Sequence, residues 1–296
     1  MRPVLPHKES PPPSLTLVGR PQDDREYLHF EHASEVPFQA DAIELSMRNA
    51  WWLAEAALLA YWPDDEASVI FRDAAQLDSV LIDDGGTEAY IAWDEASVIV
   101  AFRGVQPDQP IDVWTDVDVV QTEWIHDGER VHEGFANALN DRAWRAIADR
   151  LAALPGRRVW VTGHSLGGAL ATLAADRLPD VAGVYTFGSP RVGDPTFVRG
   201  FNRRHAGRSF RFVNHRDVVA RVPPARVFDV EFDHVERELR FDAKGHLVEM
   251  TPGAPAAPNA GETKSTIALV GPVIDHTPRR YAVHVWNALA GSMAPV

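Results

Sequence analysis

The chain has 296 residues, of which 45% are hydrophobic, and this content is ample for the core of one large domain. Its formal net charge of −13, from 29 basic and 42 acidic residues, argues against nucleic acid and anionic membrane surfaces as partners. It contains no cysteine, which excludes disulfides and thiolate metal sites, and no apolar run approaches the roughly 18 residues of a membrane-spanning helix.

The beginning of the chain is rich in proline. Residues 1–35 predict an irregular extension, and residues 36–296 a single domain. Residues 1–13 lack the apolar stretch of about 7–15 residues that is typical of a signal peptide. A chain without cysteines also suits a reducing compartment. We therefore expect a cytoplasmic location.

The first half of the domain shows a helical pattern and two short strand patterns. Apolar residues recur at steps of three and four over residues 41–62, which predicts a long helix. Within it, we expect one of Trp51 and Trp52 to pack inward and the other to lie at the edge. The further elements expected here are strands over residues 69–71 and 89–93 and a helix over residues 135–154.

Strand and helix patterns then alternate along the chain. Strands are expected around residues 99, 160, 185 and 211, with helical segments between them. This alternation predicts an α/β fold with a largely parallel sheet. Finally, residues 228–232 and 238–241 are expected to pair as a hairpin, and residues 251–266 to form a loop.

A short glycine-rich motif carries the strongest chemical signal. The run Thr162-Gly163-His164-Ser165-Leu166-Gly167-Gly168 follows a β-rich stretch and precedes a run rich in alanine and leucine. It places G-x-S-x-G at a strand–turn–helix junction, which is the context of a nucleophile elbow. Gly163 and Gly167 remove side chains that would collide at so sharp a turn. Ser165 begins a helix, where free N–H groups favour developing negative charge, and we predict that it is a nucleophile.

A serine nucleophile needs a histidine base, and the base needs an acid that orients it. In folds with this elbow, the acid and then the histidine follow the serine along the chain. Asp217 and Asp194 both follow an expected strand, and position favours Asp217 without excluding Asp194. His276 lies in a loop before a C-terminal amphipathic stretch and is the expected base, whereas His284 lies inside that stretch. The other late histidines are His205, His215, His234 and His246.

Six segments carry motifs in a fixed order: residues 98–104, 132–135, 162–171, 186–194, 213–224 and 275–281. Together they resemble the class 3 lipases, α/β-hydrolases related to secreted fungal triacylglycerol lipases. The resemblance covers about residues 40–290. It implies an α/β-hydrolase fold for the domain, with Ser165 as nucleophile, Asp217 as acid and His276 as base.

The same resemblance implies an oxyanion hole made by the backbone N–H groups of Val105 and Leu166. The family usually has Ser or Thr where this chain has Val105, so a hydroxyl donor is missing while the backbone donor remains. Residues 106–114 match the position of the family's lid. Their two prolines and polar side chains leave little apolar face, so we expect weak activation at a lipid surface.

These observations predict a serine carboxylester hydrolase, and specifically a lipase that cleaves acylglycerols or other lipid esters through an acyl-enzyme. A phospholipase or acyltransferase with the same three residues, and a catalytically silent lipid-binding homologue, are the alternative hypotheses. No cofactor and no metal are implied, since the chain has none of the motifs that bind them. The expected partner is a lipid or small ester substrate, with at most transient contact with a lipid surface and no nucleic acid. No pattern points to a particular oligomeric state.

Overall fold

The computed structural model describes residues 5–10, 21–84, 86–105, 119–235, 237–248, 271 and 273–293. The expected lid over residues 106–114 and the expected loop over residues 251–266 lie outside these residues. Within the described part of the chain, no helix is long and apolar enough to span a membrane.

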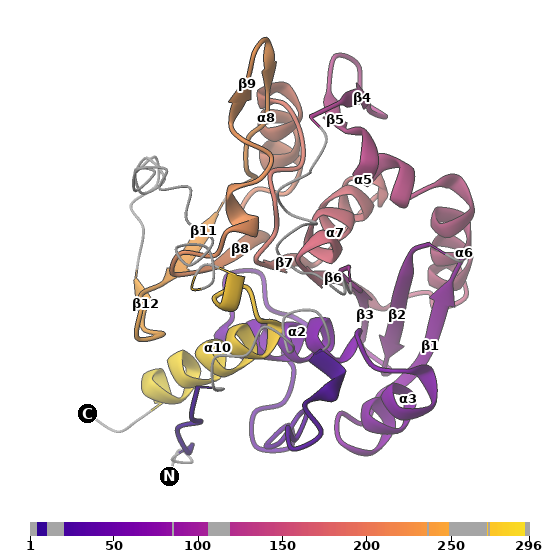
Figure 1. Ribbon diagram of the computed structural model, residues 1–296. Coiled ribbons are helices and arrows are strands. Elements are labelled where there is room, and N and C mark those ends of the chain that lie inside the picture. Colours follow the sequence, from indigo (N-terminus) through magenta and orange to yellow (C-terminus); the bar gives the residue numbers. More distant parts are fainter. Residues whose placement is uncertain are drawn as a thin grey trace.

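The centre of the molecule is one eight-stranded sheet (Figure 1). In spatial order, its strands are β1 (Asp78–Asp83), β2 (Glu88–Trp93), β3 (Ser97–Phe102), β6 (Arg158–His164), β7 (Gly183–Phe187), β8 (Ser209–Asn214), β11 (Glu238–Phe241) and β12 (Leu247–Val248). The five strands from β3 to β11 run parallel, and the outer strands pair antiparallel. The prediction of a largely parallel sheet is therefore confirmed.

Helices cover both faces of this sheet (Figure 1). On one face lie α5 (Glu133–Ala138), α6 (Asp141–Ala152), α7 (Leu166–Arg177) and α8 (Pro195–Arg204); on the other lie α2 (Met47–Leu59), α3 (Asp64–Asp73) and α10 (Pro278–Met293). The shorter elements are η1 (Pro21–Asp23), η2 (Val219–Arg221), the pair β4 (Gln121–Glu123) with β5 (Arg130–His132), and the pair β9 (Arg226–Val227) with β10 (Val230–Glu231). Burial on both faces explains why β3, β7 and β8 are continuous runs of buried residues.

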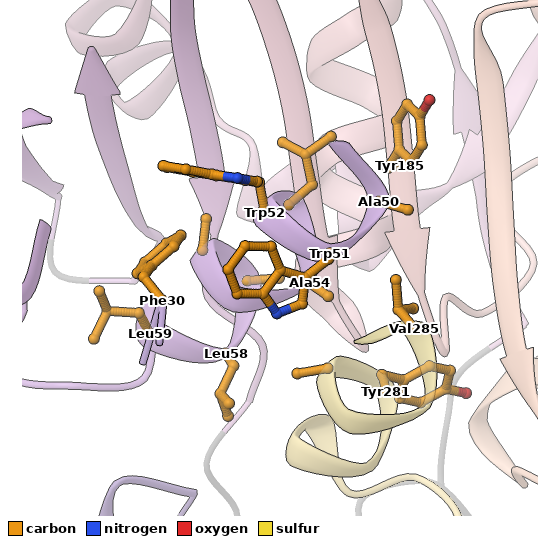
Figure 2. Close-up of a cluster of buried hydrophobic side chains, with 14 of the residues drawn as sticks. Phe30, Ala50, Trp51, Trp52, Ala54, Leu58, Leu59, Tyr185, Tyr281 and Val285 are labelled. Carbon is orange, nitrogen blue, oxygen red and sulfur yellow. The ribbon is translucent and has the colours of Figure 1, made fainter. Parts of the chain in front are cut away.

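Helix α2 lies between the sheet and α10 (Figure 2). It is apolar on nearly every side, and such a helix is stable only when every side is covered. Trp51 and Trp52 are both buried, with exposed fractions of 0% and 5%. The prediction that one of them lies at an edge is therefore wrong, because the segment before α2 covers it: the Nε1–H group of Trp52 donates a hydrogen bond to the backbone oxygen of Val36 at 2.8 Å.

The described part of the N-terminal segment packs into the same core. Leu5, Tyr27 and Phe30 are buried there, and Figure 2 shows Phe30 beside Trp52. Apart from η1, this segment has no regular helix or strand among its described residues up to position 46. A domain boundary at residue 35 stays a prediction.

The long helix expected over residues 41–62 is shorter in the structure. Helix α2 begins at Met47, because the Ser46 hydroxyl caps it by accepting a hydrogen bond from the Asn49 N–H at 3.2 Å. The helix ends at Leu59, ahead of the proline at position 63 that starts the next one.

Residues 69–71 form part of helix α3 rather than a strand. The run Val69-Ile70-Phe71 has high β propensity, but three acidic residues follow Pro63 and occupy the first turn, where they favour a helix. Ala67 and Phe71 are buried one turn apart, so the helical spacing brings both to the core.

The expected helix over residues 135–154 is two helices, α5 and α6. The break falls at Leu139, and Asn140 begins α6 as its cap. The side-chain oxygen of Asn140 accepts hydrogen bonds from the N–H groups of Arg142 at 2.8 Å and Ala143 at 3.0 Å. A side chain that accepts hydrogen bonds from two backbone N–H groups favours the start of a new helix over the continuation of the previous one.

The hairpin expected between residues 228–232 and 238–241 is also absent. Residues 238–241 form β11, which extends the central sheet parallel to β8. The segment before it folds on itself as the small hairpin of β9 and β10. Local patterning gives both segments as strands but cannot show with which strand each one pairs.

Candidate active site

Ser165 lies at the sharp turn between β6 and α7. Its φ of 62° and ψ of −131° are values that non-glycine residues rarely adopt. Its N–H donates a hydrogen bond to the Phe187 oxygen at 2.9 Å. A Cβ at Gly163 would lie 2.1 Å from the Gly167 oxygen, and one at Gly167 would lie 2.2 Å from the Phe102 oxygen. Both glycines are therefore required by close backbone approach, as the motif predicts.

The end of β3 passes directly beside Ser165. A Cβ at Gly104 would lie 3.1 Å from the Ser165 Cβ, so the next residue, Val105, follows within the same neighbourhood. Leu166 is the first residue of α7, where backbone N–H groups have no helical acceptor. Val105 and Leu166, the predicted oxyanion donors, thus lie in the two chain segments next to the serine.

Asp217 and His276 form a buried pair. The His276 Nδ1 lies 2.8 Å from the Asp217 Oδ2, and the two residues are 2% and 1% exposed. The other carboxylate oxygen accepts a hydrogen bond from the Val219 N–H at 2.8 Å. Gly188, with a φ of 59°, packs against this pair, since a Cβ there would lie 2.7 Å from the Asp217 Oδ2 and 3.0 Å from the His276 Nδ1. A carboxylate held this way fixes the imidazole's orientation and its tautomer.

Tyr281 of α10 supports the same carboxylate. Its hydroxyl donates a hydrogen bond to the Asp217 Oδ2 and accepts one from the Asn214 N–H at 2.9 Å. Burial first, and then the negative charge of Asp217, raise the pKa of Tyr281 well above its usual value. The tyrosine therefore stays protonated and remains a donor.

His164 connects the strand that precedes Ser165 to the loop of His276. Its Nε2 lies 2.8 Å from the backbone oxygen of His276, and its Nδ1 lies 2.8 Å from the Tyr61 hydroxyl. A carbonyl only accepts, so Nε2 carries the proton and Nδ1 accepts from Tyr61. Burial, followed by the proximity of His276, lowers the pKa of His164 well below its usual value, so the ring stays neutral. The motif places His164 beside the serine, but nothing local in the sequence indicates these two partners.

The alternative acid and base lie elsewhere. Asp194 caps α8, because its side chain accepts a hydrogen bond from the Phe197 N–H at 2.7 Å. His284 is buried in α10 against Phe241, and its Nε2 lies 3.3 Å from the Ser10 hydroxyl. Neither belongs to the group of side chains around Asp217 and His276, so the geometry favours the expected acid and base over both alternatives.

A second cluster of polar side chains lies near α7 and α8. His126, Glu129 and Asp176 bring possible metal-ligand atoms within 4.8 Å of one another. However, the guanidinium of Arg204 bonds Glu129 at 2.7 Å and Asp176 at 2.8 Å, and Trp124 donates to Asp176 at 2.9 Å. A cation would have to displace this guanidinium, so the cluster is better described as an ion pair network.

The arrangement defines a class of protein. Ser165, Gly188 and Asp217 all follow the carboxyl ends of neighbouring parallel strands, and the base faces them from a later loop. A nucleophile at the strand–helix turn of such a sheet is the defining feature of the α/β-hydrolases, and the prediction of this fold is confirmed.

Comparison with known sequences shows a family resemblance over the central part of the chain. The sequence model of the family described as "Lipase (class 3)" matches residues 99–227, which include the elbow and Asp217. These residues match the class 3 lipase family.

Individual relatives agree with this. The chain is 40% identical over 123 residues to a secreted mono- and diacylglycerol lipase of Malassezia restricta, covering 38% of this chain and 39% of the relative. It is 34% identical over 165 residues to a lipase of Rhizomucor miehei, covering 50% and 43%. The structure resembles lipase II of Rhizopus niveus with a TM-score of 0.54 and 25% identity, over 68% of this chain and 83% of the other.

The aligned part of the chain spans about two fifths of the length of the two curated relatives described above. The name of the Malassezia restricta relative also corrects one prediction. That relative is secreted, so the expected cytoplasmic location is wrong. The expectation rested on composition and on the N-terminal residues, and neither is a specific signal of compartment.

Proposed function

We propose that this protein is a serine carboxylester hydrolase, and specifically a lipase, with its activity carried by a single domain over residues 36–296. The observation that carries the proposal is the buried Asp217–His276 pair on the same sheet edge as the strained Ser165. The family supports it, and so do the names of the relatives as lipases.

The proposed reaction assigns one role to each of these side chains. The Ser165 Oγ attacks the ester carbonyl carbon while His276 takes the hydroxyl proton on its Nε2. Asp217 accepts the Nδ1–H and stabilises the imidazolium that forms. The N–H groups of Val105 and Leu166 bind the oxyanion, and the proton then passes from His276 to the leaving alcohol. Water, deprotonated by the same imidazole, cleaves the acyl-enzyme and releases the fatty acid.

Acylglycerols are the proposed substrates. The relative from Malassezia restricta is named as a mono- and diacylglycerol lipase, and the relative from Rhizomucor miehei is named as a lipase. These names support a lipid ester and an extracellular location for this protein. No cofactor is required, because every proton and charge in the proposed reaction is handled by a side chain or a backbone group.

Substitution of the three proposed residues tests the proposal. Ser165→Ala and His276→Ala should each lower kcat for p-nitrophenyl butyrate by roughly 10⁴–10⁶-fold, because the three groups act as a unit. Asp217→Asn should be milder. His284→Gln is the matched control, since this buried histidine is outside the site and should keep the parental rate. Loss of activity in His284→Gln with activity retained in His276→Ala would contradict the assigned base.

A fluorophosphonate probe separates the alternative hypotheses. It should label the parent chain and not Ser165→Ala, whereas a silent lipid-binding protein would label in neither. Products from triacylglycerol, monoacylglycerol and phospholipid, with and without a second alcohol as acceptor, then distinguish a lipase from a phospholipase or an acyltransferase. Release of fatty acid from phospholipid alone would overturn the acylglycerol assignment.

A further inference from the structure

The tip of the β9–β10 hairpin exposes a phenylalanine. Phe228 is 92% exposed, the largest exposed fraction among the large hydrophobic side chains of the described residues. The pairs Val227–Val230 and Arg226–Glu231 leave Phe228 and Asp229 as a two-residue loop. Figure 1 shows this hairpin projecting beside α8, on the far side of the sheet from α2 and α10.

The backbone of Phe228 is strained as well as exposed. Its φ is +52°, in the left-handed region, and glycine is the usual residue at a two-residue hairpin loop that requires such a value. A single exposed hydrophobic side chain is ordinary, but an aromatic ring in a conformation that disfavours any side chain is not. Strain and exposure at one residue indicate that Phe228 contacts a partner outside the protein.

The base of the hairpin is fixed to the edge of the active site. The Arg191 N–H donates to the Val222 oxygen at 2.8 Å, and its guanidinium donates to the Pro223 oxygen at 2.7 Å. The Asp233 N–H donates to the Gly193 oxygen at 2.8 Å. Residues 191–193 follow Gly188, which packs against Asp217 and His276, so the hairpin rises from the same sheet edge.

The neighbouring hairpin of β4 and β5 adds a second apolar group. The Gln121 Nε2–H donates to the Glu231 oxygen at 2.6 Å and joins the two hairpins. Val120, the residue before it, is 48% exposed. The hairpin is therefore attached both at its base and at β10.

The charges of the hairpin favour an uncharged partner. Arg226 pairs with Glu231 at 3.4 Å, and Asp229 adds a negative charge at the tip. With the net charge of −13, this argues against attraction to an anionic membrane. A tip of two residues is also far smaller than the roughly 1,200 Å² that a stable protein interface buries.

We propose that Phe228 inserts into an uncharged lipid surface, such as an acylglycerol droplet, and holds the active-site edge against it. This inference rests on the proposed function, because it assigns how that site reaches its substrate. Transfer of one aromatic ring from water into lipid strengthens adsorption by roughly 10-fold to 100-fold.

Binding to droplets can be measured without hydrolysis in the full chain carrying Ser165→Ala. The probe is triolein emulsified with phosphatidylcholine, and flotation gives the partition constant. Phe228→Gly should lower that constant by about 10-fold or more, while the hairpin keeps its fold because glycine accepts the positive φ. Phe228→Trp should retain binding. Ile43→Ser is the control, since Ile43 is 74% exposed in the segment before α2, where Ala42 and Leu45 pack against the core that contains α2 and α10.

Four outcomes would overturn the proposal: no droplet binding by the parent, equal binding by Phe228→Gly, an equal loss in Ile43→Ser, or preference for droplets containing phosphatidylglycerol. A dimer in sedimentation that Phe228→Gly dissociates would instead assign the tip to a second copy of the chain. With Ser165 restored, the ratio of tributyrin-emulsion to dissolved-ester hydrolysis should fall about 10-fold in Phe228→Gly. If the parent binds droplets but hydrolyses no ester, the proposed function fails while the adsorption result stands.

Discussion

His164 makes two hydrogen bonds that act on the position of the proposed base. Its Nε2–H reaches the backbone oxygen of His276, and its Nδ1 accepts from Tyr61 of the segment after α2. Because His164 directly precedes Ser165, one ring sets the spacing between the proposed nucleophile and the loop that carries the proposed base. Its low pKa, caused first by burial, keeps this ring neutral, and the carbonyl oxygen of His276 keeps the proton on Nε2. We assign His164 as a positioning residue.

Two substitutions of His164 separate positioning from packing. His164→Leu removes the donor to the His276 oxygen, and kcat should fall by about 10-fold to 100-fold with little change in KM, because displacement of the base affects mainly the transition state. His164→Gln places an amide N–H near the position of Nε2, so most of the lost kcat should return. The measurement is kcat and KM for p-nitrophenyl butyrate, with Tm recorded for both variants. Equal kcat in Leu and Gln variants of equal Tm would exclude the positioning role.

The proposed catalytic side chains could be selected from the sequence. The side chains that hold them in position could not. The elbow motif and the family segments name Ser165, Asp217 and His276 directly. Tyr61 lies 103 residues before His164, and its contact exists only after α2 packs on β6. Long-range side-chain pairs of this kind leave no periodic signal in a single sequence.

Among the helices and strands, the local sequence pattern predicted an element correctly where burial alone determines its structure. The apolar runs of β3, β6, β7 and β8 are covered on both faces, so their burial needs no knowledge of the neighbours. The strand predicted at residues 69–71 is wrong, because the helix signals before these residues outweigh their β propensity. The hairpin predicted for β11 is wrong, because the partner of a strand depends on the tertiary fold and not on the local sequence.

A buried carboxylate joins the N-terminal segment to α2. Glu55 is 0% exposed, accepts a hydrogen bond from the Tyr27 hydroxyl and one from the Trp51 Nε1–H at 3.1 Å, and lies 3.4 Å from the His29 Nδ1. Burial alone would raise the pKa of Glu55, but the hydrogen bond and charge of His29 and the charge of Lys8 outweigh it and lower the pKa. The carboxylate therefore stays ionised and holds the segment around Tyr27 and His29 against α2.

Removal of this carboxylate should loosen the N-terminal segment. Glu55→Ala should reduce the free energy of unfolding by about 3–5 kcal/mol, because its donors would be buried without an acceptor. Tyr27→Phe should cost about 1 kcal/mol, and the double variant should cost less than the sum. Urea denaturation measures all three, with the exposed Glu95→Gln as control. Additive effects would show that Tyr27 and Glu55 are not coupled.

Across the described residues, several buried or half-buried histidines favour the neutral form. Burial is the first cause that lowers the pKa of His164, His234 and His284, and the value for His284 is about 4. Arg280 lowers the pKa of His284 further, His246 acts in the same direction, and Asp242 opposes them. These histidines bind protons in the unfolded chain at a higher pH than in the folded protein.

The pH dependence of stability follows from this difference. Below about pH 6.5 the unfolded chain takes up protons that the folded chain excludes, so the contribution of these histidines to stability is constant above that pH and falls as pH decreases toward 4. Each such histidine contributes a slope of about 1.4 kcal/mol per pH unit. Raised pKa values of Asp275 and Glu88, caused first by burial, add an opposing slope as these carboxyls take up protons first in the folded state.

The free energy of unfolding in urea at pH 7.5, 6.0 and 5.3 gives this slope directly. The last value is the isoelectric point of the chain, so its net charge approaches zero across the window and repulsion decreases. A loss of stability there therefore comes from specific groups and not from overall charge. His284→Gln should lower this slope by about 1.4 kcal/mol per pH unit, because the glutamine side chain binds no proton in either the folded or the unfolded chain. Parallel curves for the parent and His284→Gln would rule out His284 as one of the groups responsible.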